Sequence, residues 1–171
     1  RLVATAGHDK VVMLWDVATG ERVRCLTGHV ASVFSVAFSP TGQSVATASA
    51  DRTTRLWDVV EGQNRRQLVG HADSVTMAAF SHDGRLIVTG SRDGTAMLWD
   101  VATRQMVRQL QGHEDCVWSA VFSPDGRQIV TASADRTVRL WDAATGNEVL
   151  QLNGHKAGVL SAVFGPNGRL V

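Results

Sequence analysis

The chain has 171 residues, of which 44% are apolar and 19% are charged, and its formal net charge is +1. This composition is typical of a folded domain and excludes a disordered chain, a collagen and a coiled coil. No stretch approaches the roughly 18 consecutive apolar residues of a membrane span. The near-zero net charge gives no specific signal for nucleic acid. We therefore expect neither a membrane nor a nucleic acid as partner.

The two cysteines, Cys25 and Cys116, cannot build the disulfide framework of a small secreted domain. The sequence also lacks an Asn-x-Ser/Thr glycosylation site. Both observations favour a reducing compartment, so we expect an intracellular, cytoplasmic protein.

Two dipeptides repeat every 42 residues along the chain. Gly-His begins at residues 28, 70, 112 and 154, and Trp-Asp begins at residues 15, 57, 99 and 141. A period in the low forties with these signatures is typical of propeller blades, each built from four short antiparallel strands. The repeat therefore predicts an all-β fold.

The expected strands follow this period in chain order. Residues 1–27 hold three strands, because the sequence opens at the second strand of a blade, whereas residues 28–69, 70–111 and 112–153 hold four each. Residues 154–171 contain one more first strand, Val159–Phe164, and then only Arg169–Val171 of the next. One propeller segment of about four blades is thus expected over residues 1–171.

Arginines mark the fourth strand of the copies. We interpret them as charges that keep an exposed sheet edge from pairing with other chains, ahead of a basic docking stripe. They are Arg22, Arg24, Arg65, Arg66 and Arg108.

These features resemble the WD-repeat β-propeller family over the whole chain. Residues 122–146, FSPDGRQIVTASADRTVRLWDAATG, are close to a family consensus. The resemblance implies blades closed into a ring, commonly of seven, so that this chain is part of a larger ring. It also implies a rigid, non-catalytic scaffold for protein or peptide partners.

Each copy also contains the ingredients of a hydrolytic triad, namely a His, a Thr and an Asp. In the hairpin around Asp51 we expect Thr47 to lie about opposite Trp57, so that these groups converge. An active site repeated in every unit would be odd, whereas a structural clamp must be repeated. By resemblance the sets are hydrogen-bonded tetrads: His29, Thr47, Asp51 and Trp57; His71, Thr89, Asp93 and Trp99; His113, Thr131, Asp135 and Trp141.

Other signatures of chemistry are missing from the sequence. It has no phosphate-binding loop, HExxH, CxxC or GxSxG motif, and its six histidines show no spacing of metal ligands. We predict no enzyme, no cofactor and no metal.

The two ends of the chain leave two hypotheses open. The first copy has Thr5, Asp9 and Trp15 but no preceding Gly-His, and His155 lacks tetrad partners. Either the chain is an excerpt of a longer propeller, which we prefer, or residues 154–164 complete the first blade and bring His155 to that set. The second hypothesis gives a four-blade ring or, between two chains, an eight-blade ring. Exposed end blades would also favour self-association.

Partner binding is expected on the face that carries the Gly-His segments and the turns before the third strands. Two columns of the repeat differ most between copies: His8, Ala50, Arg92 and Ala134 before the turn Asp, and Phe34, Thr76, Trp118 and Leu160 after the Gly-His pair. The resemblance adds Ser32, Ser74, Cys116 and Gly158.

We predict that Trp118, Arg92 and Phe34 form a patch for a protein or peptide, because aromatic and Arg side chains anchor many interfaces. The alternative is that Trp118 and Phe34 only pack between blades near the channel mouth. A single arginine gives little reason to favour an acidic or phosphorylated peptide.

Overall fold

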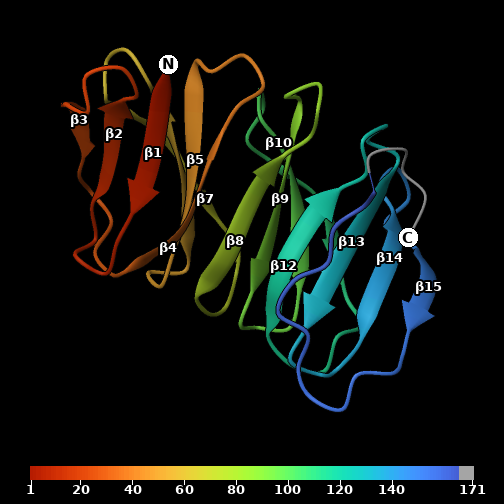
Figure 1. Ribbon diagram of the computed structural model, residues 1–171. Helices are drawn as coiled ribbons and strands as arrows, with labels where there is room; N and C mark the ends of the chain where they lie inside the picture. The colour runs from red at the N-terminus through yellow and green to blue at the C-terminus, as the bar shows by residue number, and fades with distance from the viewer. Residues whose placement is uncertain (166–171) are drawn as a thin grey trace.

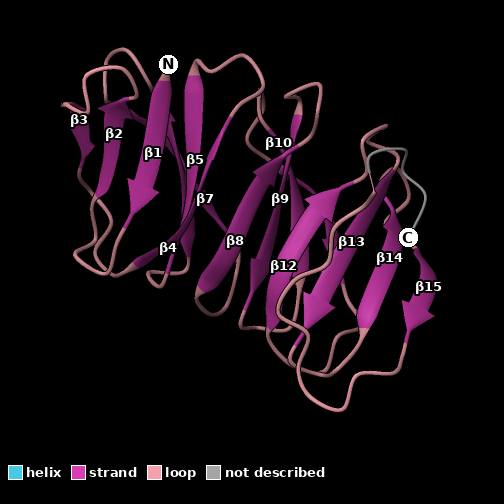
Figure 2. Ribbon diagram, in the orientation of Figure 1, coloured by secondary structure: helices cyan, strands magenta, loops and turns pink. Residues whose placement is uncertain are grey.

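The fold is all-β and consists of four antiparallel sheets placed side by side in an arc (Figure 1). It is seen in a computed structural model that describes residues 1–165. Strands and loops account for all of these residues (Figure 2). Within this described part, no helix is long and apolar enough to cross a membrane.

The sheets follow one another in chain order, and we call them blades 1 to 4. Blade 1 has three strands: β1 (Leu2–Ala6), β2 (Val12–Asp16) and β3 (Arg22–Leu26). Blade 2 has four: β4 (Val33–Phe38), β5 (Ser44–Ser49), β6 (Thr53–Asp58) and β7 (Asn64–Val69). Blade 3 contains β8 (Val75–Phe80), β9 (Leu86–Ser91), β10 (Ala96–Asp100) and β11 (Met106–Leu110). Blade 4 contains β12 (Val117–Phe122), β13 (Gln128–Ser133), β14 (Val138–Asp142) and β15 (Glu148–Leu152).

Turn chemistry explains why the chain folds back at regular intervals. Between β4 and β5, Gly42 has a φ of 70°, a left-handed conformation in which glycine meets no steric penalty. Between β6 and β7, the Asp58 carboxylate accepts hydrogen bonds from the backbone N–H groups of Val60 and Glu61, each 2.7 Å long. The Asp of every Trp-Asp pair therefore shapes the turn to the fourth strand.

The core lies between neighbouring blades rather than within one sheet. Blade 1 contributes Val12 and Leu14, both fully buried, to a cluster that also holds Val45 and Trp57 of blade 2. The same arrangement recurs between blades 2 and 3 and between blades 3 and 4. Trp57, Trp99 and Trp141 thus face the preceding blade, and both faces of the inner sheets are covered.

The segment after β15 runs to the end of the described residues. Residues 159–164 carry no strand assignment, and the residues that would pair with them lie outside the described part, so the first strand expected there stays a prediction. A first strand pairs with the second strand of its own blade, as β4 pairs with β5, and this sequence holds only Arg169–Val171 of that partner. Those three residues lie outside the described part of the chain.

The segment covers the outer face of blade 4 in the way that β4 covers blade 1, where the N–H of Val33 donates to the carbonyl of Gly7 at 3.1 Å. The N–H of Val159 donates to the carbonyl of Ser133 at 2.8 Å, and Val159 is buried against Val130 and Val138 with Ala162 beside it. It follows β15 at one end of the arc, whereas β1 lies at the other end (Figure 1). The described residues therefore do not close blade 1 within this chain.

Two of the outer-strand arginines act differently from the simple edge charges that we expected. The Arg24 Nε and Nη2 groups donate to the carbonyl of Val60 in blade 2, at 3.1 and 2.7 Å. Arg108 donates to the carbonyl of Ala144 in blade 4 at 3.0 Å. These side chains connect the fourth strand of a blade, its outer rim, to the next blade. The pattern of a single sheet does not predict such a contact between blades. The side chain of Arg65 lies outside the described structure.

Candidate functional site

The three complete His-Thr-Asp-Trp sets come together as hydrogen-bonded relays. In blade 2, His29 Nδ1 lies 2.7 Å from Asp51 Oδ2, and His29 Nε2 lies 2.7 Å from Thr47 Oγ1. The Trp57 indole N–H donates to the same hydroxyl oxygen at 2.9 Å. Blades 3 and 4 repeat these contacts within 0.1 Å, through the sets built on His71 and His113.

The hairpin register differs slightly from our expectation. Thr47 pairs directly with Arg55, and Trp57 pairs with Val45, so Thr47 and Trp57 are diagonal rather than opposite. Diagonal neighbours on one face are close enough for an aromatic side chain to bridge them. The indole reaches the hydroxyl for this reason.

The electrostatics of the relay favour a neutral imidazole beside a carboxylate. Burial lowers the pKa of His29 and of His113, although hydrogen bonds to Asp51 and Asp135 oppose this shift. Burial alone would raise the pKa of Asp51, but hydrogen bonds from Thr53, His29 and the Val30 N–H outweigh it and lower the pKa. The Nδ1–H then donates to the carboxylate, and Nε2 accepts from the Thr hydroxyl.

This arrangement suits a structural clamp and not a nucleophile. Thr47, Thr89 and Thr131 have no exposed surface at all, and each hydroxyl already serves a histidine and an indole. Leaving any of these buried polar groups unpaired would cost about 1 to 3 kcal/mol. The relay therefore fixes the Gly-His segment to the second and third strands of its blade.

The first blade holds only part of such a set. The Trp15 indole donates to Thr5 Oγ1 at 2.8 Å, and Asp9 accepts from the Val11 N–H at 3.3 Å. Thr5 is exposed. His155 is exposed as well and belongs to the segment after β15, so the described chain does not bring it to Thr5, Asp9 and Trp15.

A second group of side chains gathers where the Gly-His segments and the turns before the third strands emerge, the end of the blades that we call the loop face. The Arg92 guanidinium lies 5.7 Å from the ring centroid of Phe34 and 5.7 Å from that of Trp118. His8 makes an edge contact with Phe34, with 6.2 Å between ring centroids. We call His8, Phe34, Arg92 and Trp118 the loop-face patch.

The fold explains why this patch spans three blade junctions. Phe34 lies on β4 and Trp118 on β12, while Arg92 follows β9 of the intervening blade 3. The residues of blades 2 and 3 at the equivalent repeat positions are small, namely Ala50 for Arg92 and Thr76 for Trp118. Arg92 can therefore contact both rings.

The remaining candidate binding residues divide by exposure. Ser74, Thr76 and Cys116 are buried, and the Thr76 hydroxyl donates to the carbonyl of Val117 at 2.6 Å. Burial raises the pKa of the Cys116 thiol to about 11. Ser32 is half-buried and contacts His8 Nδ1 at 3.1 Å, whereas Leu160 is 71% exposed on the segment after β15. The buried residues therefore offer little surface to a partner.

Comparison with known proteins agrees with this architecture. The family described as "WD domain, G-beta repeat" matches residues 20–58, 62–100 and 104–142, which is more than half of the chain. This chain belongs to the WD-repeat family.

Individual relatives resemble this WD-repeat chain over about one repeat. They include transcription initiation factor TFIID subunit 5 of Caenorhabditis elegans, 44% identical over 43 residues, and the F-box-like/WD repeat-containing protein TBL1X of Mus musculus, 48% identical over 42 residues. The nuclear distribution protein PAC1 of Mycosarcoma maydis is 42% identical over 45 residues. These alignments cover 25%, 25% and 26% of this chain but only 7%, 8% and 10% of the relatives.

The WD repeats are out of phase with the blades. The first matched unit, residues 20–58, begins before β3 of blade 1 and ends with β6 of blade 2. Each repeat therefore supplies the outer strand of one blade and the first three strands of the next.

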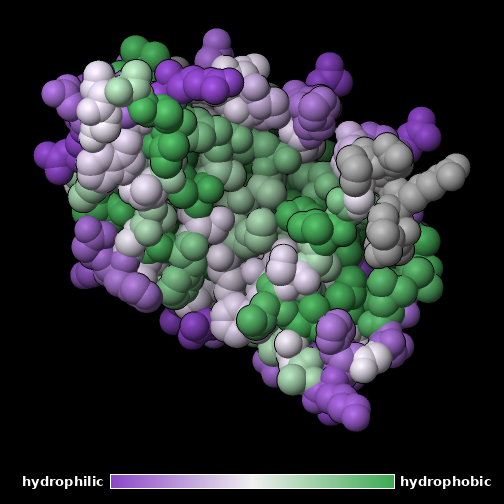
Figure 3. Space-filling view, in the orientation of Figure 1, coloured by the Kyte–Doolittle hydropathy of each residue, from purple (hydrophilic) through white to green (hydrophobic). Residues whose placement is uncertain are grey.

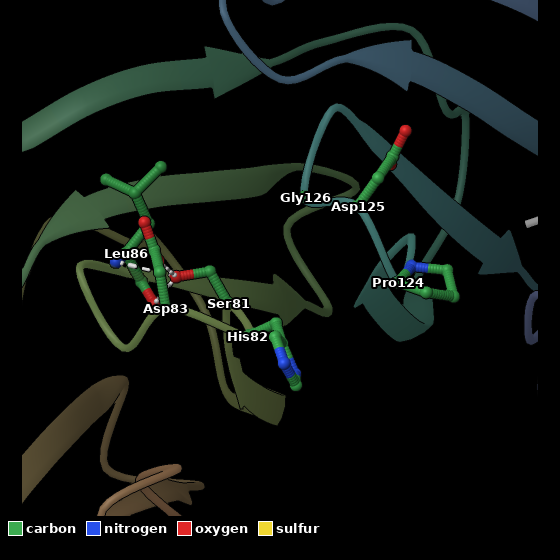
Figure 4. A pocket seen from close by; sticks show the side chains of 7 residues that line it. All are labelled: Ser81, His82, Asp83, Leu86, Pro124, Asp125 and Gly126. Carbon is green, nitrogen blue, oxygen red and sulfur yellow. Dashed lines mark hydrogen bonds between the residues drawn. The ribbon is translucent and has the colours of Figure 1, made fainter.

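The opposite end of the WD blades carries a hollow of about 190 Å³ between blades 3 and 4. Figure 4 shows Ser81, His82, Asp83 and Leu86 on one side and Pro124, Asp125 and Gly126 on the other. Asp83 and Asp125 accept hydrogen bonds from Ser81 and Ser123 within their own turns, both at 2.6 Å. Its carboxylates are thus engaged, and no group of three metal-ligating side chains occurs among the described residues.

Sequence reasoning missed one member of each WD-repeat relay. Thr53, Thr95 and Thr137 donate both a backbone N–H and a hydroxyl to the second oxygen of the turn Asp, with hydroxyl distances of 2.6 to 2.7 Å. The sequence contains a signal for this contact, because a Thr follows the turn Asp by two residues in each of these three copies. Blade 1 has Val11 there.

Proposed function

We propose that this WD-repeat chain is a non-catalytic interaction scaffold that binds a protein or peptide through its loop-face patch. The observation that supports this proposal most is the position of Arg92 between Phe34 and Trp118. Arg92 is exposed, Phe34 is 39% exposed and Trp118 is half-buried, so all three offer surface to a partner. Buried aromatic and Arg anchors supply much of the energy of protein interfaces.

The rigidity of the blades also supports this function. The patch is held by β4, β12 and the turn after β9, and these elements are fixed by the relays and by inter-blade cores. A preorganised surface loses little conformational freedom on binding. Nothing comparable in side-chain chemistry occurs in the hollow at the other end of the blades.

Peptide selection against the chain tests the proposal. We expect a random displayed peptide library to yield binders whose affinity falls at least about tenfold with Trp118→Ala or Arg92→Ala. The matched control is Arg85→Ala, because the Arg85 side chain is 85% exposed and lies at the opposite end of β9. Selected peptides whose affinity is unchanged by both Trp118→Ala and Arg92→Ala would contradict the proposal.

A second candidate function is structural, namely completion of a ring with further blades or with a second copy of the chain. It is favoured by blade 1, which lacks an inner first strand and leaves Val3 49% exposed and Thr5 exposed. Apolar surface continues across the face seen in Figure 3, between β1 and β12. Such surface on end blades favours association.

Light scattering after size exclusion, at two concentrations, distinguishes the two functions. A stable 18.4 kDa monomer would favour the scaffold acting alone. A stable dimer would favour a shared ring, and concentration-dependent aggregates would favour blades that need further blades of a longer protein.

A further inference from the structure

Arg92 differs from Arg24, Arg108 and Arg139 in how its side-chain donors are used. Arg24 and Arg108 donate to carbonyls of the next blade, and Arg139 donates to Glu148 Oε2 at 2.6 Å. Among the described residues, no acceptor takes a hydrogen bond from the Arg92 side chain. Its Cζ atom lies over the rings of Phe34 and Trp118, 5.7 Å from each centroid.

This position leaves the N–H donors of the Arg92 guanidinium without an acceptor among the described residues, between two aromatic rings. A guanidinium carries five N–H donors in one plane, and its fork matches the two oxygens of a carboxylate. Contact with two rings limits the rotamers of the side chain, so less freedom is lost when that fork is occupied. His8 also contacts Phe34, in an edge-to-face geometry.

The surroundings favour a single negative charge in the partner. Asp73 and Asp115 lie near this part of the loop face, and each carboxylate is engaged by the next backbone N–H, at 2.5 and 2.6 Å. Their field reaches the Cys116 thiol beneath the patch, as does the opposing field of Arg92. Asp73, Asp93 and Asp115 outnumber the two arginines that act here, Arg52 and Arg92, which suits a carboxylate better than a doubly charged phosphate.

Resting on the proposed function, we propose that the loop-face patch recognises a peptide segment with an Asp or Glu side chain next to an apolar side chain. The carboxylate accepts two hydrogen bonds from the free edge of Arg92. The apolar neighbour packs on the exposed parts of Phe34 and Trp118. In the sequence, one arginine gives little reason to expect an acidic peptide. In the structure, its position between Phe34 and Trp118 with unused donors makes it a candidate receptor for a carboxylate.

The test uses synthetic, C-terminally amidated peptides made from the sequences selected against the full chain, with affinity measured by isothermal titration calorimetry. We expect acidic residues to be enriched, and replacement of that Glu or Asp by Gln or Asn to weaken binding at least about tenfold. With Arg92→Gln, the acidic and amide peptides should bind equally. Arg92→Lys should recover part of the difference, because it keeps the charge and loses the planar fork.

The outcomes separate this inference from the proposed function. If Trp118→Ala weakens binding but the acidic-to-amide exchange in the peptide does not, the patch binds partners and the carboxylate receptor is wrong. If phosphoserine in place of Glu binds more than about tenfold tighter, the preference for a single charge is overturned. If selected peptides ignore both Arg92→Gln and Trp118→Ala, the proposed function fails with the inference. Arg85→Gln serves as the control throughout.

Discussion

Blades 2 to 4 and blade 1 carry the same Trp-to-Thr hydrogen bond in different surroundings. Trp57, Trp99 and Trp141 are 1%, 3% and 2% exposed, whereas Trp15 is only half-buried and its partner Thr5 is exposed. The bond is nevertheless 2.8 Å long in blade 1, as short as in the others. The hairpin register alone thus sets this bond, and the Gly-His segment and the preceding blade add the rest of the relay and its burial.

The largest contrast is expected from the tryptophans. Trp99→Ala removes a side chain packed among Ala46, Leu56 and Val75 and should lower the free energy of unfolding by about 3 to 5 kcal/mol. Trp15→Ala removes a half-exposed ring and should cost less than half as much. Urea unfolding followed by circular dichroism measures both. Equal losses would show that blade 1 is buried in solution, through association or further structure.

The hydroxyls should give a smaller contrast of the same kind. Thr89→Val leaves the His71 and Trp99 ring nitrogens without their partner in a buried site, at an expected cost of about 1 to 3 kcal/mol. Thr5→Val frees one indole N–H that can reach water, and should change stability by about 0.5 kcal/mol or less. The comparison uses the same urea midpoints, and a large effect of Thr5→Val would contradict it.

Acidification should lower the free energy of unfolding through the relays of blades 2 and 4. His29 and His113 have lowered pKa values in the fold, so unfolding takes up protons as the pH falls below the ordinary histidine value of about 6.5. The stability that their neutral forms provide is present above that pH and is lost as the pH falls toward the folded pKa. The lowered pKa of Asp51 extends the loss below about pH 4. Urea midpoints measured across this range should fall steadily, and a midpoint that rises from about pH 7 to 5 would be incompatible with neutral relays.

The rim arginines should show the smallest difference. Arg24→Ala breaks the hydrogen bonds to Val60 and should cost about 0.5 to 1.5 kcal/mol. Arg66 occupies the equivalent place on blade 2, but Arg104 stands where Gly62 and Gly146 receive the stems of Arg24 and Arg108. No tie to the next blade is seen from Arg66 in the described structure, so Arg66→Ala should be nearly neutral. Thermal unfolding of the two variants side by side checks this difference.

Much of the fold could be predicted because the sequence signals for strands and turns recur every 42 residues. The spacing of the Gly-His and Trp-Asp pairs was enough to predict the all-β blades, and comparing equivalent positions singled out Arg92, Phe34 and Trp118 as different. The geometry now places these three in contact, while their role in binding stays a proposal.

The parts that could not be predicted depend on neighbours that a local pattern does not contain. The packing of residues 159–164 on Val130 and Val138 depends on the neighbouring blade and not on the local apolar pattern. The rim ties of Arg24 and Arg108 likewise depend on carbonyls 36 residues away. Tertiary context decides both.

The offset between repeats and blades has a consequence for how such a chain can change in length. Because every stretch of 42 residues, wherever it begins, contains one full set of four strands in cyclic order, recombination between two copies of a gene could add or remove one period at any point. The junction would still read as a complete blade. Propeller size could then vary in evolution by whole blades, without a precise genetic boundary, while single positions such as Arg92 diverged afterwards.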